Sequence, residues 1–247
     1  MAYIKNLINT GRKTISKNFY KSVRTISSES KIVSFTFDDV PKSTFENAVP
    51  ILNKYKLSGT FYIALSLMEG VSEKKLYTRE NLLECIESGH ELACHSFGHI
   101  HFFQTSDTGF IKEDLKKNKD TLESLDLNAS FENFSYPYGE QTVISKRVVS
   151  RIFKSCRGTD NGINSGKVDL NSLKGIKLYE NRNSKEKIDL LLKEFDRSGG
   201  WLIFYTHDVQ EHFTSVGCSP EYLEYVINRC HESGFEIKSI KQVISSL

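Results

Sequence analysis

Residues 31–41 read KIVSFTFDDVP, and this stretch places a strand directly before two adjacent carboxylates. Residues 32–37 have the β-branched and aromatic composition that favours a strand. Because successive side chains on a strand point to opposite faces, Asp38 and Asp39 can converge on one site only if the strand ends there. Pro41 favours such an ending. Taken alone, the pattern is also typical of a solvated turn or a helix cap.

Outward from this strand, short β-type runs alternate with helical patterns along the chain. The alternation predicts an α/β fold with a parallel sheet. The number of strand–helix units approaches that of a closed barrel, in which chemistry lies at the carboxyl ends of the strands. We expect the polar loop 158–175 to lie over one end of the sheet. The expected strands are 32–37, 60–65, 91–94, 131–136, 153–156, 201–206 and 235–237, and the expected helices are 44–55, 79–88, 111–125, 142–150, 185–197, 220–232 and 240–244.

Four of the seven histidines fall between residues 90 and 101, around the expected strand 91–94. His95 and His99 are four residues apart, so one helical or turn-like segment can aim both imidazoles at one point. Neutral imidazole is the commonest metal ligand. The segment therefore indicates either a metal site or a histidine-rich surface loop, with His90 and His101 as its other members.

Two further expected strands end in chemically useful groups. Pro137 and Tyr138 follow the strand 131–136, and such a rigid turn can leave a backbone N–H pointing outward as an oxyanion donor. The same residues also fit an ordinary β-turn. His207 ends the apolar strand 201–206, where it is either a general acid or an exposed residue without a role. Trp201 begins that strand, so we expect it to lie away from the catalytic end.

Composition limits the class of protein. The 247 residues suffice for one large domain or two small ones. With 33 basic and 31 acidic residues the net charge is +2, which calls for no nucleic-acid partner. No apolar run approaches the ~18 residues of a transmembrane helix or the ~7–15 of a secretory signal. The five cysteines are odd in number and widely spaced, which favours reduced thiols in a cytoplasmic protein.

The first 28 residues contain six basic residues and no acidic one. We expect residues 1–30 to form a basic N-terminal extension of a domain made by residues 31–247. Apolar residues within the extension fall roughly on one helical face. That face predicts either an interfacial helix that touches an anionic membrane surface or an amphipathic helix that covers one end of the domain. Its residues are Ile4, Leu7, Ile8, Ile15 and Phe19.

In this order, the four segments resemble the NodB-type polysaccharide deacetylases, carbohydrate esterase family four. The family motif TFDD is similar to residues 36–39, and the motif HSxxH is similar to residues 95–99. The motif RxPY matches only at Pro137 and Tyr138, and the motif of the last strand ends at His207. The resemblance covers residues 31–247 and implies that they form a NodB-like deacetylase domain, a distorted (β/α) barrel.

The resemblance also implies a site with one divalent metal ion. Asp39, His95 and His99 would be the ligands, and this donor set suits Zn²⁺, with Co²⁺, Ni²⁺ or Fe²⁺ as alternatives. Asp38 would be the base that takes a proton from the attacking water. His207 would be the acid that protonates the leaving nitrogen.

The third motif departs from the family pattern. Pro137 and Tyr138 would contribute to substrate binding, with the Tyr138 N–H facing the oxyanion. Ser135 occupies the place of the arginine that steadies the catalytic aspartate in the family. Arg157, after the next expected strand, is the candidate substitute and is grouped with the substrate-binding residues, although it also reads as a surface arginine beside a glycine turn. Asp160 has no clear matching context in the fourth motif.

These implications predict a metal-dependent hydrolase that removes an N-acetyl group from an amino sugar of a cell-surface glycan or of its lipid-linked precursor. The reaction would take place in the cytoplasm, with peripheral contact at the inner face of the membrane through residues 1–28. The alternatives are a deformylase of a lipid-linked amino sugar, a catalytically inactive carbohydrate-binding domain, and a hydrolase of a non-sugar amide such as a cyclic ureide.

Overall fold

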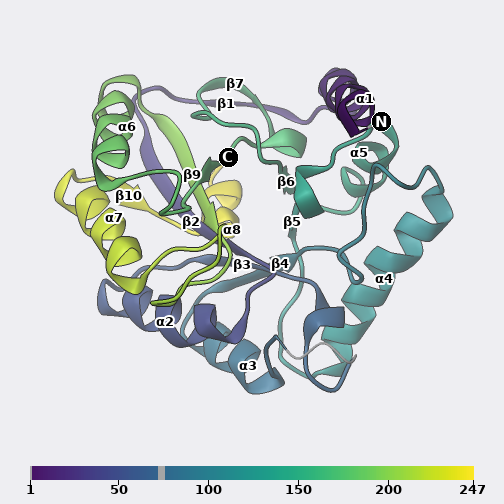
Figure 1. The fold of residues 1–247 in the computed structure, drawn as a ribbon, viewed down its shortest axis with the longest axis horizontal. Coiled ribbons are helices and arrows are strands. Elements are labelled where there is room, and N and C mark those ends of the chain that lie inside the picture. Colours follow the sequence, from purple (N-terminus) through teal and green to yellow (C-terminus); the bar gives the residue numbers. More distant parts are fainter. Residues whose placement is uncertain (1, 72–75) are drawn as a thin grey trace.

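The computed structural model describes residues 2–71 and 76–247, with side chains described from residue 7 onward. Its central strand is β2 (Lys31–Asp38), which lies between β3 (Thr60–Ile63) and β9 (Gly200–Thr206) in one sheet (Figure 1). The last six residues of β2 and every residue of β3 and β9 are buried. Strands covered on both faces need apolar side chains on both, which is why they read as near-continuous apolar runs.

The main sheet is parallel and curled. Its strand order is β6-β5-β4-β3-β2-β9-β8, and β10 (Glu236–Ile237) pairs with the beginning of β2. The other strands are β4 (Glu91–Cys94), β5 (Asn133–Ser135), β6 (Ser155–Arg157) and β8 (Ile176–Lys177). Strands β6 and β8 end the order, and a single bridge from Arg157 to Leu173 links β6 to the segment before β8. The sheet is therefore the expected barrel in a distorted, incompletely closed form.

Helices cover the outside of the curled sheet (Figure 1). α2 (Lys42–Lys54), α3 (Arg79–Glu87), α4 (Thr108–Ser124) and α5 (Val143–Val149) follow β2, β3, β4 and β5. α6 (Lys185–Ser198) and α7 (Pro220–Glu232) follow β8 and β9. The apolar faces of α2, α6 and α7 bury Val49, Phe195 and Val226 in the same core cluster as Phe35 and Phe204 of the sheet.

The amino ends of the strands are closed by α8 (Ile240–Ser245). The Ile240 N–H donates to Thr60 Oγ1 at 2.9 Å, and the Lys241 N–H donates to Glu91 Oε2 at 2.8 Å. Thr60 and Glu91 are the first residues of β3 and β4. Ile240 shares an interior cluster with Trp201, the second residue of β9. The opposite end, where the strands have their carboxyl termini, is left for a site.

Residues 2–30 pack on the rest of the fold through a helix and a strand. α1 (Ala2–Ser16) lies against α5, and β1 (Val23–Ile26) pairs antiparallel with β7 (Gly166–Asp169). Strands β1, β7 and β8 are not among the expected elements, whereas the seven expected strands and seven expected helices are confirmed with boundary shifts of a few residues. The division into an extension (1–30) and a domain (31–247) stays a prediction. None of the helices in the described part is long and apolar enough to cross a bilayer.

Candidate metal centre and catalytic pocket

The two aspartates lie at the same end of the sheet because β2 ends between them. Asp38 is the last residue of the strand, and Asp39 and Val40 then adopt φ angles of 56° and 37°. The Val40 N–H donates to the Asp38 carbonyl at 2.6 Å. Non-glycine residues in this left-handed region carry about 1–3 kcal/mol of strain each and often occur at functional sites. His99 and Tyr138, at the same site, also adopt the left-handed conformation, with φ angles of 49° and 58°.

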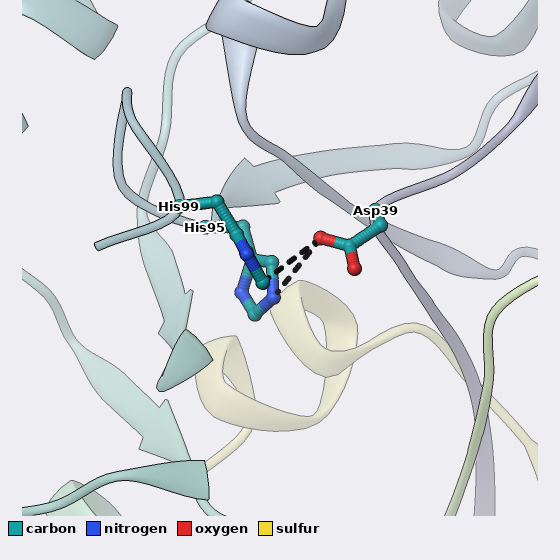
Figure 2. A group of neighbouring side chains, drawn as sticks. All are labelled: Asp39, His95 and His99. Carbon is teal, nitrogen blue, oxygen red and sulfur yellow. Dashed lines mark ion pairs between the residues drawn. The ribbon is translucent and has the colours of Figure 1, made fainter. Parts of the chain in front are cut away.

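Asp39, His95 and His99 form a compact group that could hold a metal ion (Figure 2). The Asp39 Oδ1 atom lies 3.1 Å from His99 Nε2 and 3.6 Å from His95 Nε2. One donor atom from each residue lies within 4.8 Å of the others. His95 Nδ1 lies 3.0 Å from the Ser135 carbonyl oxygen, and donation to that oxygen leaves the Nε2 lone pair directed at Asp39. Such an outer hydrogen bond is typical of metal-ligating histidines.

The protonation states of the group also suit a metal. Burial lowers the pKa of His95 to about 4 and the pKa of His99 to about 2. Both imidazoles are therefore neutral at pH 7, which is the form that binds metal ions. A carboxylate with two imidazoles leaves positions open for water and substrate, as catalytic metal sites do. The donor set thus fits a catalytic divalent ion.

Asp38 and Arg157 form a buried ion pair beside this group. The Arg157 Nη2 atom contacts both Asp38 carboxylate oxygens and lies 2.5 Å from Oδ2. The guanidinium lies between two aromatic rings, 5.1 Å from the ring centre of Tyr62 and 4.7 Å from that of Tyr205. Burial alone raises the pKa of Asp38, but the Arg157 charge opposes it and holds the pKa below its ordinary value. Asp38 is therefore ionised at neutral pH.

Arg157 contacts Asp38 from β6, the strand next to β5. Strand β5 carries Ser135, the position at which the resemblance implies an arginine. Ser135 on β5 and Arg157 on β6 are direct partners in the parallel register. The Ser135 side chain is small, and its Oγ lies 2.5 Å from His95 Nδ1 and 3.5 Å from Asp38 Oδ1. A guanidinium from the neighbouring strand can therefore occupy the space beside Asp38 that a longer side chain at position 135 would fill.

His207 follows β9 and is held by its backbone at both ends. Its N–H donates to the Val216 carbonyl at 3.2 Å, and its carbonyl accepts the Thr44 hydroxyl at 2.6 Å. The ring lies between Tyr179, whose hydroxyl is 3.4 Å from Nδ1, and Asp39, whose Oδ2 is 3.9 Å from Nε2. Burial lowers the pKa of His207 below its ordinary value. The imidazole is thus neutral and faces the metal group.

The other two clustered histidines are not part of the metal group. His90 is buried, and its Nδ1 accepts the Gly59 N–H at 3.2 Å. His101 lies 3.0 Å from Glu140 through Nδ1, and its ring stacks on Tyr138 with 3.8 Å between centres and 6° between planes. Although 55% exposed, the Tyr138 ring is therefore held over the site by its neighbours.

A cavity of about 280 Å³ is lined by Asp38, His95 and His207, whereas Asp39, His99 and Arg157 are not part of its lining. Asp160 lies outside its lining and forms ion pairs of 2.9 and 2.7 Å with Lys13 and Lys17. Pro137 is buried and, like Trp201, is absent from the lining. The residues that line the cavity are Asp38, His95, Tyr136, Tyr138, Gly139, Thr159, Lys177, Tyr179, Arg182, Tyr205, His207 and Val216.

The sequence pattern missed the part of this lining that comes from β8 and the turn after it. Lys177 is the last residue of β8, and Tyr179 and Arg182 follow in an irregular segment. A strand of two residues followed by a turn has no periodicity from which to predict it. No signal in the sequence singles out these three residues.

Comparisons with known proteins agree with this architecture. A family model described as polysaccharide deacetylase matches residues 25–152. The peptidoglycan-N-acetylmuramic acid deacetylase PdaC of Bacillus subtilis (strain 168) is 29% identical over 222 residues, which are 89% of this chain and 40% of PdaC. The chain therefore spans less than half the length of that relative.

Two solved structures show the same fold at low identity. Bacillus subtilis PdaA, a family 4 carbohydrate esterase, superposes with a TM-score of 0.64 at 15% identity, covering 94% of this chain and 88% of that one. A family 4 acetyl xylan esterase from Clostridium thermocellum, solved with a cobalt ion, superposes with a TM-score of 0.63 at 17% identity, covering 87% and 91%. At these identities the likeness establishes the distorted barrel and nothing further.

Proposed function

The chain belongs to the polysaccharide deacetylase family, and on this premise we propose that it is a metal-dependent hydrolase that removes an N-acetyl group from an amino sugar. One observation carries the proposal. At the carboxyl end of the sheet, Asp38, His95 and His207 line one cavity. Arg157 is paired with Asp38, and Asp39 and His99 complete a metal-binding group with His95. An amide is a poor electrophile with a poor leaving group, so a site for its hydrolysis needs a base, an acid and an electrophile together.

Asp39, His95 and His99 would hold the metal ion. When bound, a divalent ion supplies a Lewis acid for the acyl carbonyl and lowers the pKa of a bound water. We propose Zn²⁺ as the native ion, with Co²⁺ or Ni²⁺ as substitutes, because carboxylate with imidazole is a borderline donor set that accepts all three. The cobalt ion in the Clostridium thermocellum esterase belongs to that protein.

Three groups of the chain itself would move or stabilise charge. Asp38, kept ionised by Arg157, takes the proton of the attacking water. The Tyr138 N–H, in a turn fixed by its positive φ, donates to the developing oxyanion. His207 protonates the leaving nitrogen. Burial keeps its resting imidazole neutral, and the Asp38 charge pulls its pKa in the opposite direction, towards the imidazolium that this step requires.

We propose Arg157 as the positioning residue for Asp38, in place of the arginine absent at position 135. The support is its full burial, its contact with both carboxylate oxygens and its register opposite Ser135. Its guanidinium is enclosed by Tyr62, Tyr205 and Asp38. In this arrangement it acts on the substrate through Asp38.

The natural substrate is proposed to be an amino sugar of a cell-surface glycan or of its lipid-linked precursor, and α1 supports the lipid-linked form. Arg12 and Lys13 on the inward side of this helix contact the Phe103 carbonyl and Asp160. Leu7, Ile8 and Ile15 are each more than half exposed on its outer side. The side chain of Ile4 lies outside the described part of the chain.

An amphipathic helix with its apolar side outward is suited to the surface of a membrane. Next to it, a cavity of about 480 Å³ is lined by four lysines and two aspartates, and the excess of positive charge would attract anionic headgroups. The lysines are Lys17, Lys21, Lys167 and Lys174, and the aspartates are Asp160 and Asp169. We therefore propose peripheral contact with an anionic membrane. Cosedimentation with phosphatidylglycerol vesicles tests this contact. Ile8→Gln/Ile15→Gln should weaken binding, whereas Leu190→Gln, at a still more exposed leucine on α6, should not.

We also propose a cytoplasmic location. The support is that all five cysteines are free and buried, as thiols are in reducing compartments. They are Cys85, Cys94, Cys156, Cys218 and Cys230.

The proposed activity is tested by acetate release from N-acetylated oligosaccharides. The purified chain is stripped of metal and refilled with Zn²⁺, Co²⁺ or Ni²⁺. We expect metal-dependent release that is lost in Asp38→Asn and kept in Asp120→Asn, a surface carboxylate on α4. Metal binding without acetate release would favour deformylation, which formylated sugars then test. A chain that binds no metal would overturn the hydrolase proposal in favour of an inactive carbohydrate-binding domain.

A further inference from the structure

Two cations in the catalytic cavity have no part in the proposed mechanism. Lys177 and Arg182 line the same cavity as Asp38, Tyr138 and His207. Lys177 ends β8, and Arg182 lies in the turn that follows it. Strand β8 lies on one side of β9, and β2, which carries Asp38, lies on the other. A neutral acetamide and a neutral sugar ring need neither charge.

The backbone that carries these two residues is well fixed. Lys177 pairs in register with Tyr205 of β9, and its carbonyl accepts the Asn183 side-chain amide at 2.6 Å. The Tyr179 carbonyl accepts the N–H groups of Arg182 and Asn183, at 2.9 and 3.0 Å, which folds the segment into a tight turn. The Arg182 guanidinium lies 5.7 Å from the centre of the Tyr179 ring. The Tyr179 hydroxyl lies 3.4 Å from His207 Nδ1, so the ring that Arg182 contacts also lies beside His207.

Neither cation is neutralised within the described part of the chain. Some cations of the fold have a carboxylate partner, such as Lys185 with Glu221 on the surface and Arg157 with Asp38 in the core. No ion pair between described residues involves Lys177 or Arg182. The one carboxylate of the cavity lining, Asp38, is already used by Arg157. The lining therefore has an excess of positive charge next to the reacting centre, before any metal ion is counted.

We propose that Lys177 and Arg182 form a subsite for an anionic group on the sugar that is deacylated. This inference rests on the proposed deacetylase function and narrows its substrate to acidic N-acyl amino sugars. The shared chemistry is a carboxylate or phosphate close to the acetamide. A carboxylate would come from a lactyl ether such as that of muramic acid, and a phosphate from an anomeric ester such as a precursor carries. Arg and Lys are the side chains that bind both groups through charge-assisted hydrogen bonds.

The test compares three substrates that share one acetamide: N-acetylglucosamine, N-acetylmuramic acid and N-acetylglucosamine 1-phosphate. We expect kcat/KM for at least one acidic sugar to exceed that for the neutral sugar by about tenfold or more, as for a charge-assisted contact. The preference should fall as salt is added and shrink to within about twofold in Lys177→Gln/Arg182→Gln. Arg151→Gln, an exposed arginine after α5, should keep it. The acidic sugar that is preferred identifies the source of the anion.

A binding measurement separates this inference from the activity. The products glucosamine, muramic acid and glucosamine 1-phosphate undergo no further reaction, and calorimetry on the metal-loaded protein gives their affinities. Tighter binding of an acidic product, lost in the double variant, supports the subsite even if no acetate is released. Equal affinities and equal kcat/KM values for neutral and acidic sugars would overturn the subsite while leaving the deacetylase intact. Circular dichroism of the double variant verifies that it folds.

Discussion

Replacing Arg157 by methionine tests how Asp38 is kept ionised. Arg157 is fully buried, and its guanidinium contacts both carboxylate oxygens of Asp38. Methionine retains an unbranched apolar side chain between Tyr62 and Tyr205 but removes the charge. Among the described residues, the side-chain hydrogen bond that then remains to Asp38 comes from the Ser135 hydroxyl, 3.5 Å from Oδ1.

The expected loss of stability follows from burial. Removing one partner of a buried ion pair costs about 3–5 kcal/mol, because the other charge is left uncompensated. Asp38 and Arg157 are 4% and 0% exposed, so solvent screens the pair very little. We therefore expect Arg157→Met to lower the free energy of unfolding in urea by about 3–5 kcal/mol. The Asp38→Asn/Arg157→Met variant should lose less than the sum of the single changes, since it buries no lone charge.

The pH profile of kcat/KM examines the same pair during catalysis. Without the guanidinium, burial acts on Asp38 unopposed by that charge, and its pKa rises. A base must be ionised to act, so the acidic limb of the profile should move to higher pH. Arg151→Met, which replaces an exposed arginine in the turn after α5, is the matched control. An acidic limb that stays in place in a folded Arg157→Met enzyme would refute the positioning role.

Three further predictions follow from individual contacts. His95→Ala should weaken metal binding by more than about 100-fold, because it removes a ligand and its outer hydrogen bond together. Metal analysis after dialysis measures the loss, and full retention of metal would contradict the ligand set. Ser135→Arg/Arg157→Ser should regain part of the acetate release lost in Arg157→Ser, because the two positions are register partners; equal inactivity of both would argue against the exchange. Burial lowers the pKa of His90 to about 4, so the unfolded chain binds a proton that the fold excludes, and stability falls as pH drops below about 6.5. Between pH 7 and 4.5 the contribution of His90 amounts to about 2.5 kcal/mol. In His90→Asn, whose amide oxygen can accept the Gly59 N–H in place of Nδ1, the loss of stability measured by urea unfolding should be smaller by this amount but not abolished, because His95, His99 and His207 still contribute theirs; an unchanged loss would contradict the prediction.

Most of the sheet was predictable because its strands are long or bounded by clear signals. The strand that becomes β9 is an apolar run that ends at His207, and β2 ends at a proline-bounded turn. Strand β8 was missed because two residues have no pattern to detect. β1 and β7 were missed because their pairing joins segments about 140 residues apart, which local sequence does not encode.

The candidate metal ligands and the cavity differ in how far sequence could identify them. Asp39, His95 and His99 follow strands, which left a metal site and a solvated turn or loop both open, and the resemblance to the family motifs is what named them as ligands. Arg157 could be named only as a candidate, because the register between β5 and β6 decides whether it reaches Asp38. Lys177 ends the two-residue strand β8, and Arg182 lies in the following turn, whose direction depends on hydrogen bonds to the Tyr179 carbonyl. Strand register and hydrogen bonds between distant segments of this kind cannot be predicted from the local pattern of residue types.

Acetate release by the metal-loaded chain, measured beside its Asp38→Asn variant, tests the central claim most directly. The account predicts release from an N-acetylated amino sugar that requires a divalent metal ion and vanishes in the variant, with one metal ion still bound per chain in both. Release that persists in Asp38→Asn would contradict the assignment of the base. A metal-loaded, folded chain that hydrolyses no N-acyl amino sugar, acidic or neutral, would contradict the claim itself.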